Sequence, residues 1–177
     1  MSKYSSYHSE ICKQMKLLAE IPNSMFIGQQ CLSEDFYQTL KEIPTSKRTE
    51  MPVAEEMQLG ISIGLAIEGY LPISIYQRMD FLPRACDQLV NHLDIIKELS
   101  RGLFSPKVII RTTIGTDKPM DCGLQHKKDL IEGFRSLLRN ISIYELTTPK
   151  EVKKYYTIAR KCKESIILVE RQELYYD

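Results

Sequence analysis

Five short apolar runs recur along the chain, and each is separated from the next by a segment with helical periodicity. The runs are centred on Ile27, Ile75, Ile109, Ile143 and Leu168. Strands buried on both faces of a parallel sheet read as nearly continuous apolar runs, and helices connect them. The alternation therefore predicts an α/β fold: a three-layer sandwich with a mainly parallel sheet of five to six strands and helices on both faces. We expect residues 1–177 to form a single domain, the usual outcome for this chain length.

Helices are expected over about residues 5–20 and 147–161. In the first, Ile11, Met15 and Leu18 fall at helical spacing, and Ser5 or Ser6 can cap the N-terminus. The later helix begins at the sequence Thr147-Thr148-Pro149, because proline is favoured in a first helical turn. A shorter helix over 130–138 is expected from the apolar spacing there.

The region 80–102 also has helical spacing. Asp80 offers an N-cap, Pro83 is tolerated in a first turn, and Gly102 ends the pattern. We expect one helix that turns five apolar residues towards the core: Ala85, Leu89, Leu93, Ile96 and Leu99. Residues 29–51 and 112–124 are expected to be loops, the first with one helical turn around residues 36–40.

The segment 54–69 is ambiguous by periodicity alone. Its large apolar residues alternate with small ones, which is a strand pattern. A buried helix fits as well, because Gly60 and Gly64 would share one face at a cost of about 1 kcal/mol each against alanine.

The charge balance and the N-terminus limit the possible function classes. With 24 basic and 23 acidic residues the formal charge is +1, which gives no electrostatic basis for binding nucleic acid or an anionic membrane. The long uncharged stretches, residues 21–33 and 57–67, are too short to span a bilayer. No signal-peptide pattern is present at the N-terminus, so we expect a cytoplasmic protein.

The cysteines and histidines do not form a metal-ligand pattern. Five cysteines are odd in number and none lies in a CxxC pair, and three histidines are scattered. We therefore expect reduced thiols and no metal site within this chain. The sequence also lacks the Walker A and GxGxxG motifs.

The run from Pro52 to Pro72, PVAEEMQLGISIGLAIEGYLP, resembles the pyrimidine-binding domain of thiamine-diphosphate enzymes. It is most similar to the beta chain of the 2-oxo acid dehydrogenase decarboxylase component, in the transketolase superfamily. The pairs Asp80-Phe81 and Gln125-His126 and the run ACDQ at 85–88 match further elements of the family at the same spacing. The resemblance covers roughly residues 5–177. It implies that segment 54–69 is a helix at a subunit interface, where glycines permit close approach.

The resemblance also implies roles for four residues. Glu55, and not Glu56, takes the position of the carboxylic acid that hydrogen-bonds ring nitrogen N1′ of thiamine diphosphate and activates it. Phe81 would stack on the aminopyrimidine, Gln77 would contact the same ring, and His126 would move protons or orient the substrate carbonyl. Singly, three of these residues have an ordinary structural reading: Glu55 complements a helix dipole, Phe81 belongs to the core, and His126 is a cap or a solvated side chain.

Half of such an active site is missing from the sequence. The family holds the diphosphate and Mg²⁺ with a GDG…N motif on a second domain, and no GDG occurs in the 177 residues. We therefore expect a separate partner chain that carries the diphosphate-binding domain, a homo- or hetero-oligomer, and no activity from this chain alone. The loop 115–119 departs from the glycine-rich version in pyruvate dehydrogenases, which leaves the substrate open. The alternative is a catalytically silent interaction module of the same fold.

Overall fold

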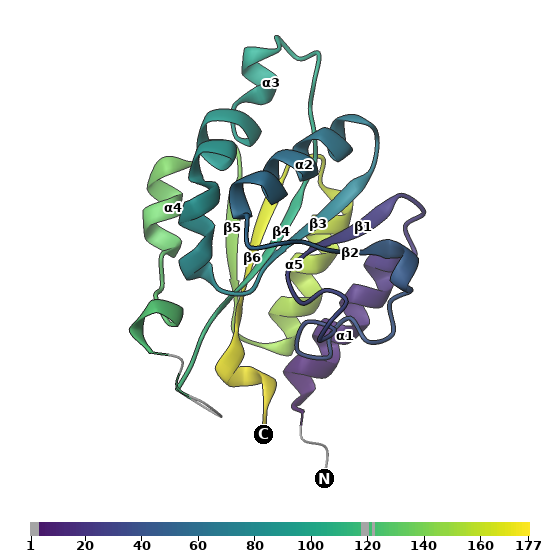
Figure 1. Ribbon diagram of the computed structural model, residues 1–177, viewed down its shortest axis with the longest axis vertical. Coiled ribbons are helices and arrows are strands. Elements are labelled where there is room, and N and C mark those ends of the chain that lie inside the picture. The colour runs from purple at the N-terminus through teal and green to yellow at the C-terminus, as the bar shows by residue number, and fades with distance from the viewer. Residues whose placement is uncertain (1–3, 118–120, 122) are drawn as a thin grey trace.

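The computed structural model describes residues 4–117, 121 and 123–177, and its centre is a six-stranded, wholly parallel sheet in the order β2-β1-β3-β4-β6-β5 (Figure 1). All five neighbouring pairs are parallel. This confirms the predicted α/β class and sheet. The strands are β1 (Ser24–Gly28), β2 (Arg48–Glu50), β3 (Leu71–Tyr76), β4 (Ile109–Ile114), β5 (Ser142–Leu146) and β6 (Ile166–Arg171).

Helices cover both faces of this sheet, as predicted. On one face α1 (Ser6–Ala19) packs against α5 (Pro149–Lys161) over a core that includes Phe26 and Leu168. On the other face lie α2 (Glu55–Ile67) and α4 (Ile131–Leu137), over a core that includes Ile110 and Val169. The alternating side chains of β4 and β6 therefore enter both cores, which is why these strands read as continuous apolar runs.

The predicted helix ends are set by local capping. The Ser5 side chain accepts a hydrogen bond from the backbone N–H of His8, and the Thr148 side chain accepts one from that of Glu151. Pro149 occupies the first turn of α5, where its missing N–H costs nothing. The segment 55–67 is a helix, so its alternating pattern does not reflect a strand. Leu59 and Ile63 face the core while Met57 and Ile61 remain exposed.

The expected continuous helix over 80–102 is wrong. A 3-10 segment (Met79–Ala85), a π-type turn (Gln88–Leu93) and the short α3 (Ile96–Leu99) take its place. Pro83 lies inside the 3-10 segment and cannot donate a helical hydrogen bond. Asp80 is not an N-cap; its carboxylate accepts from the backbone N–H of Lys128 at 3.3 Å.

Two expected loops contain more structure than their sequences indicated. Strand β4 continues to Ile114, three residues beyond the predicted run. Within 29–51, β2 forms a polar edge strand, and residues 35–38 form a left-handed turn with φ between 40° and 63°. The turn buries Phe36, and Leu40 beyond it is also buried, so this segment is part of the core and not merely a surface loop.

In the part of the chain that the structure describes, no helix combines the length and hydropathy that crossing a membrane requires.

Candidate active site

The segments that carry the four candidate residues meet at the carboxyl edge of the sheet, where parallel α/β folds bind ligands. Gln77 and Phe81 follow the end of β3, and His126 follows the loop after β4. Glu55 is the first residue of α2, the helix that precedes β3 in the chain. The fold thus brings positions 71 residues apart to one edge.

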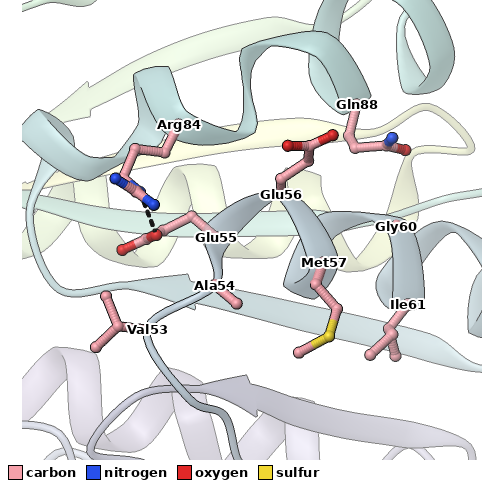
Figure 2. A pocket seen from close by; sticks show the side chains of 9 residues that line it. All are labelled: Val53, Ala54, Glu55, Glu56, Met57, Gly60, Ile61, Arg84 and Gln88. Atoms are coloured by element: carbon pink, nitrogen blue, oxygen red, sulfur yellow. Dashed lines mark hydrogen bonds and ion pairs between the residues drawn. The ribbon is translucent and has the colours of Figure 1, made fainter.

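Glu55 is buried, with 3% of its surface exposed, and its carboxylate has two partners. Arg84 Nε donates to Oε2 at 2.9 Å, and Gln29 Nε2 donates to Oε1 at 3.4 Å (Figure 2). The Arg84 side chain is 67% exposed, so one partner of this ion pair is solvated and the other is not. A buried carboxylate needs such compensation, because desolvation without a partner is costly.

The hydroxyl of Tyr76 fixes the backbone beneath this carboxylate. It donates to the carbonyl oxygen of Glu55 at 3.3 Å. Burial raises the pKa of Tyr76, so the hydroxyl remains a donor at neutral pH. The first turn of α2 is thereby tied to the end of β3.

A concavity of about 790 Å³ opens beside Glu55. Figure 2 shows it bounded by the start of α2 and by the segment that carries Arg84 and Gln88. Glu56 also borders this space but is exposed and points towards Gln88, so the two adjacent glutamates differ in environment. The lining residues are Val53, Ala54, Glu55, Glu56, Met57, Gly60, Ile61, Arg84 and Gln88.

Phe81 and His126 form a second group of candidate residues. Their rings meet edge to face, with centroids 5.5 Å apart and planes at 90°. His126 Nδ1 is buried and has no hydrogen-bond partner among the described residues. The backbone carbonyl of Gln77 accepts from the Thr113 hydroxyl at 2.6 Å, which fixes the chain just before Phe81. Among residues 4–117, 121 and 123–177, neither Phe81, Gln77 nor His126 lines the concavity beside Glu55.

Gly115 allows the His126 segment to pack against the end of β4. A Cβ at this position would lie 2.1 Å from the carbonyl oxygen of His126 and 3.0 Å from Nε of Arg78. Real Cβ atoms do not approach backbone oxygen that closely, so only glycine permits this contact. The loop glycine therefore positions His126.

Two arginines at this edge were missed by the sequence analysis. Arg84 pairs with a glutamate 29 positions away, and Arg78 contacts Tyr37 41 positions away. No local spacing marks such long-range partners. The available signal was indirect: a buried carboxylate at Glu55 requires a compensating cation or donor somewhere in the fold.

Comparison with known proteins relates the chain to subunits of pyruvate dehydrogenase. No family model matches it. It is 29% identical over 126 residues to the pyruvate dehydrogenase E1 component subunit beta of Gracilaria tenuistipitata, and 25% identical over 126 residues to that of Mycoplasma pneumoniae. Each alignment covers 71% of this chain and 38% of the relative, so the chain spans well under half the length of these relatives. These matches show distant homology.

Two solved transketolases share the fold. A split-gene transketolase described as an inactive beta4 tetramer aligns with 94% of this chain and 50% of its own, with a TM-score of 0.68. Transketolase from Campylobacter jejuni aligns with 94% of this chain and 26% of its own, with a TM-score of 0.71. Both are 14% identical in sequence, so the likeness is one of fold. The chain therefore shares its fold with a part of each of these transketolases.

Proposed function

We propose that this chain is the pyrimidine-binding half of a thiamine-diphosphate-dependent enzyme of 2-oxo acid dehydrogenase or transketolase type. One observation carries the proposal: the buried carboxylate of Glu55, at the start of α2, opens onto a concavity of about 790 Å³. The homology to pyruvate dehydrogenase E1 beta subunits supports the reaction class named in this proposal.

The carboxylate of Glu55 fits the pyrimidine half of thiamine diphosphate, whereas, among the described residues, Phe81, Gln77 and His126 do not line the concavity beside it. Arg84 takes Oε2 of Glu55, whereas Oε1 receives only a long 3.4 Å bond from Gln29. Oε1 is therefore the oxygen available to a ring nitrogen. Because Arg84 is largely exposed, it can also leave the carboxylate without breaking a packed core. When bound, the cofactor supplies a nucleophilic carbon for reaction with a substrate carbonyl.

The chain's own residues then have distinct tasks. Glu55 holds a proton at the ring nitrogen N1′. Phe81 offers an aromatic face for stacking, and Gln77 orients the same ring. His126 lies in edge contact with Phe81, where it can move a proton at the substrate oxygen. Proton transfer by positioned groups of this kind contributes about 10²–10⁴-fold in rate.

A partner chain completes the proposed site. The sequence has no GDG motif with which to hold a diphosphate and Mg²⁺, and we place that half on a separate chain. The split-gene transketolase, an inactive beta4 tetramer, offers a parallel in which one kind of chain assembles without activity. We therefore expect this chain to be inactive alone.

A second candidate function is a catalytically silent interaction module. Its supporting observation is the Arg84 contact, which compensates the Glu55 charge from within the chain. Arg84 then serves as a structural partner of Glu55, and the apolar side chains exposed along α2 serve only for binding another protein.

Calorimetry with and without a partner separates the two functions. The test titrates thiamine diphosphate and Mg²⁺ into the chain alone, and into its complex with a GDG…N-bearing chain that co-purifies from the native host. We expect weak or no binding alone, since stacking and one strong hydrogen bond barely offset the cost of immobilising the cofactor. We expect clear binding in the complex. Tight binding to the isolated chain contradicts the half-site proposal, and no binding by any complex supports the silent module.

A further inference from the structure

Arg84 is the one cationic partner of the Glu55 carboxylate among the described residues. Its Nε donates to Oε2 at 2.9 Å, and the neutral side chain of Gln29 donates to Oε1 at 3.4 Å. The Arg84 side chain is largely exposed and borders the concavity of about 790 Å³, whereas Glu55 is buried. Figure 2 shows the Glu55 side chain turned towards Arg84, while the adjacent Glu56 points towards Gln88. The ion pair thus accompanies one particular orientation of the buried carboxylate.

A second position competes for this carboxylate, at the N-terminus of its own helix. Ala54, the N-cap of α2, makes no side-chain hydrogen bond to the helix. The backbone N–H groups of Glu56 and Met57 have no acceptor among the described residues. Such unpaired N–H groups and the helix dipole attract a negative charge to the first turn. The Glu55 carboxylate is nevertheless bonded to Arg84 and not to these N–H groups.

The segment that carries Arg84 is anchored independently of this ion pair. It is the 3-10 segment Met79–Ala85, which also carries Phe81. The carboxylate of Asp80, in the same segment, accepts from the backbone N–H of Lys128 at 3.3 Å. Because one anchored segment carries both side chains, the arginine fixes the carboxylate relative to the aromatic ring that we propose for stacking.

We propose that Arg84 is a positioning residue that holds the Glu55 carboxylate away from the helix N-terminus and leaves Oε1 for a ring nitrogen of the aminopyrimidine. The ligand named here rests on the proposed function, whereas the orientation of the carboxylate does not. Arginine suits this task because it keeps its charge and directs planar N–H groups at fixed angles. Without Arg84, the carboxylate turns back to the first-turn N–H groups and no longer presents Oε1 to a ring.

NMR of the full 177-residue chain tests the orientation without cofactor or partner. In Arg84→Gln, the amide protons of Glu56 and Met57 should move downfield, because they then donate to the carboxylate. The double variant Arg84→Gln/Glu55→Gln should lose most of this shift, and Arg84→Lys should show less of it. Unchanged amide resonances in Arg84→Gln, or an equal shift in the double variant, overturn the inference. The exposed position of Arg84 favours folded variants, and if Arg84→Gln does not fold, Arg84→Lys decides.

Kinetics of the complex with the GDG…N-bearing chain test the consequence for the cofactor. Arg84→Gln should lower kcat about a hundredfold, the effect of misplacing a reacting group by about 1 Å, and Arg84→Lys should restore part of it. Arg139→Gln, at an exposed arginine, should change nothing. An unchanged kcat in Arg84→Gln, within an active wild-type complex, overturns the positioning role alone. A wild-type complex that binds no cofactor overturns the proposed function and, with it, the ligand assigned to Oε1.

Discussion

Glu55 and Glu56 are adjacent in sequence but have different surroundings at the start of α2. Glu55 is buried against Arg84 and Gln29, and Glu56 is exposed beside Gln88. Both positions benefit from the helix dipole, so the dipole alone does not distinguish them. Burial does, because the Glu55 carboxylate is shielded from bulk water and the Glu56 side chain is exposed to it. At the residue scale, this is the physical basis for assigning Glu55 the proposed role.

Glu55→Gln should largely abolish turnover in the reconstituted complex, while Glu56→Gln should change it little. The amide keeps the shape of the side chain but cannot hold the proton at N1′. Loss of an interaction made in the transition state lowers kcat and kcat/KM together. Steady-state kinetics of both variants, with thermal unfolding as a folding control, measure this. Full activity in Glu55→Gln contradicts the assignment.

A buried ion pair between Arg111 of β4 and Glu170 of β6 stabilises the core. Both residues are fully buried, and Glu170 also accepts from the hydroxyls of Tyr156 at 2.5 Å and Tyr175. Burial raises the pKa of both tyrosines, so they remain donors at neutral pH. Every carboxylate oxygen is therefore satisfied.

Glu170→Gln should destabilise the chain strongly, because it leaves the Arg111 charge buried without its counter-ion. Breaking a buried pair in this way typically costs about 3–5 kcal/mol. Glu145→Gln, which removes a partly exposed partner of Arg171, is the matched control and should cost less than about 1 kcal/mol. Urea unfolding measures both free energies. Equal costs for the two variants contradict the argument.

At the scale of elements, the sheet was predictable and the connections were not. Strands β3, β4 and β6 are apolar on both faces, and this pattern is independent of their partners. By contrast, Ala85, Leu89 and Leu93 face the core from 3-10 and π turns, so their spacing did not distinguish these turns from an α-helix, and the expectation that Leu99 faces the core is wrong because it is 66% exposed. The left-handed turn at 35–38 contains no glycine, and its conformation is therefore imposed by burial of Phe36 rather than by local preference.

The candidate site, like the secondary-structure elements, was predictable only in part. The resemblance selects Glu55 and Phe81 by spacing, but it contains no information about which cations the fold brings to them. The contacts of Arg84 and Arg78 depend on segments joined only in the folded chain. Edge contact between Phe81 and His126 likewise depends on the packing of Gly115.

Gly115→Ala should displace the His126 segment and separate the Phe81 and His126 rings, because the new Cβ cannot remain 2.1 Å from a backbone oxygen. We expect lower stability and altered aromatic resonances for both residues. Gly133→Ala is the control, since nothing lies within 4 Å of a Cβ there and the helix should gain about 0.5–1 kcal/mol. Unchanged spectra in Gly115→Ala contradict this account of how His126 is positioned.

At the scale of the whole molecule, α2 is the helix whose second face lacks a cover. Met57 is 46% exposed, Ile61 41% and Ile67 40%, although the opposite side of the helix is buried against β3. Exposed apolar side chains gathered on one element typically mark an interaction surface. We therefore predict that this chain assembles into a dimer or larger species through α2.

The substitution Gly64→Ala should raise the stability of the isolated chain but weaken its assembly. No atom lies within 4 Å of a Cβ at Gly64, so alanine should stabilise the helix by about 1 kcal/mol in the isolated chain. In an assembly packed on this face, the same methyl group obstructs close approach and should weaken association, as should Ile61→Glu. Gly133→Ala, with an equally open environment on α4, should leave association unchanged. Sedimentation velocity over a range of concentrations measures the effect, and a wild-type chain that stays monomeric at high concentration rules out the α2 interface.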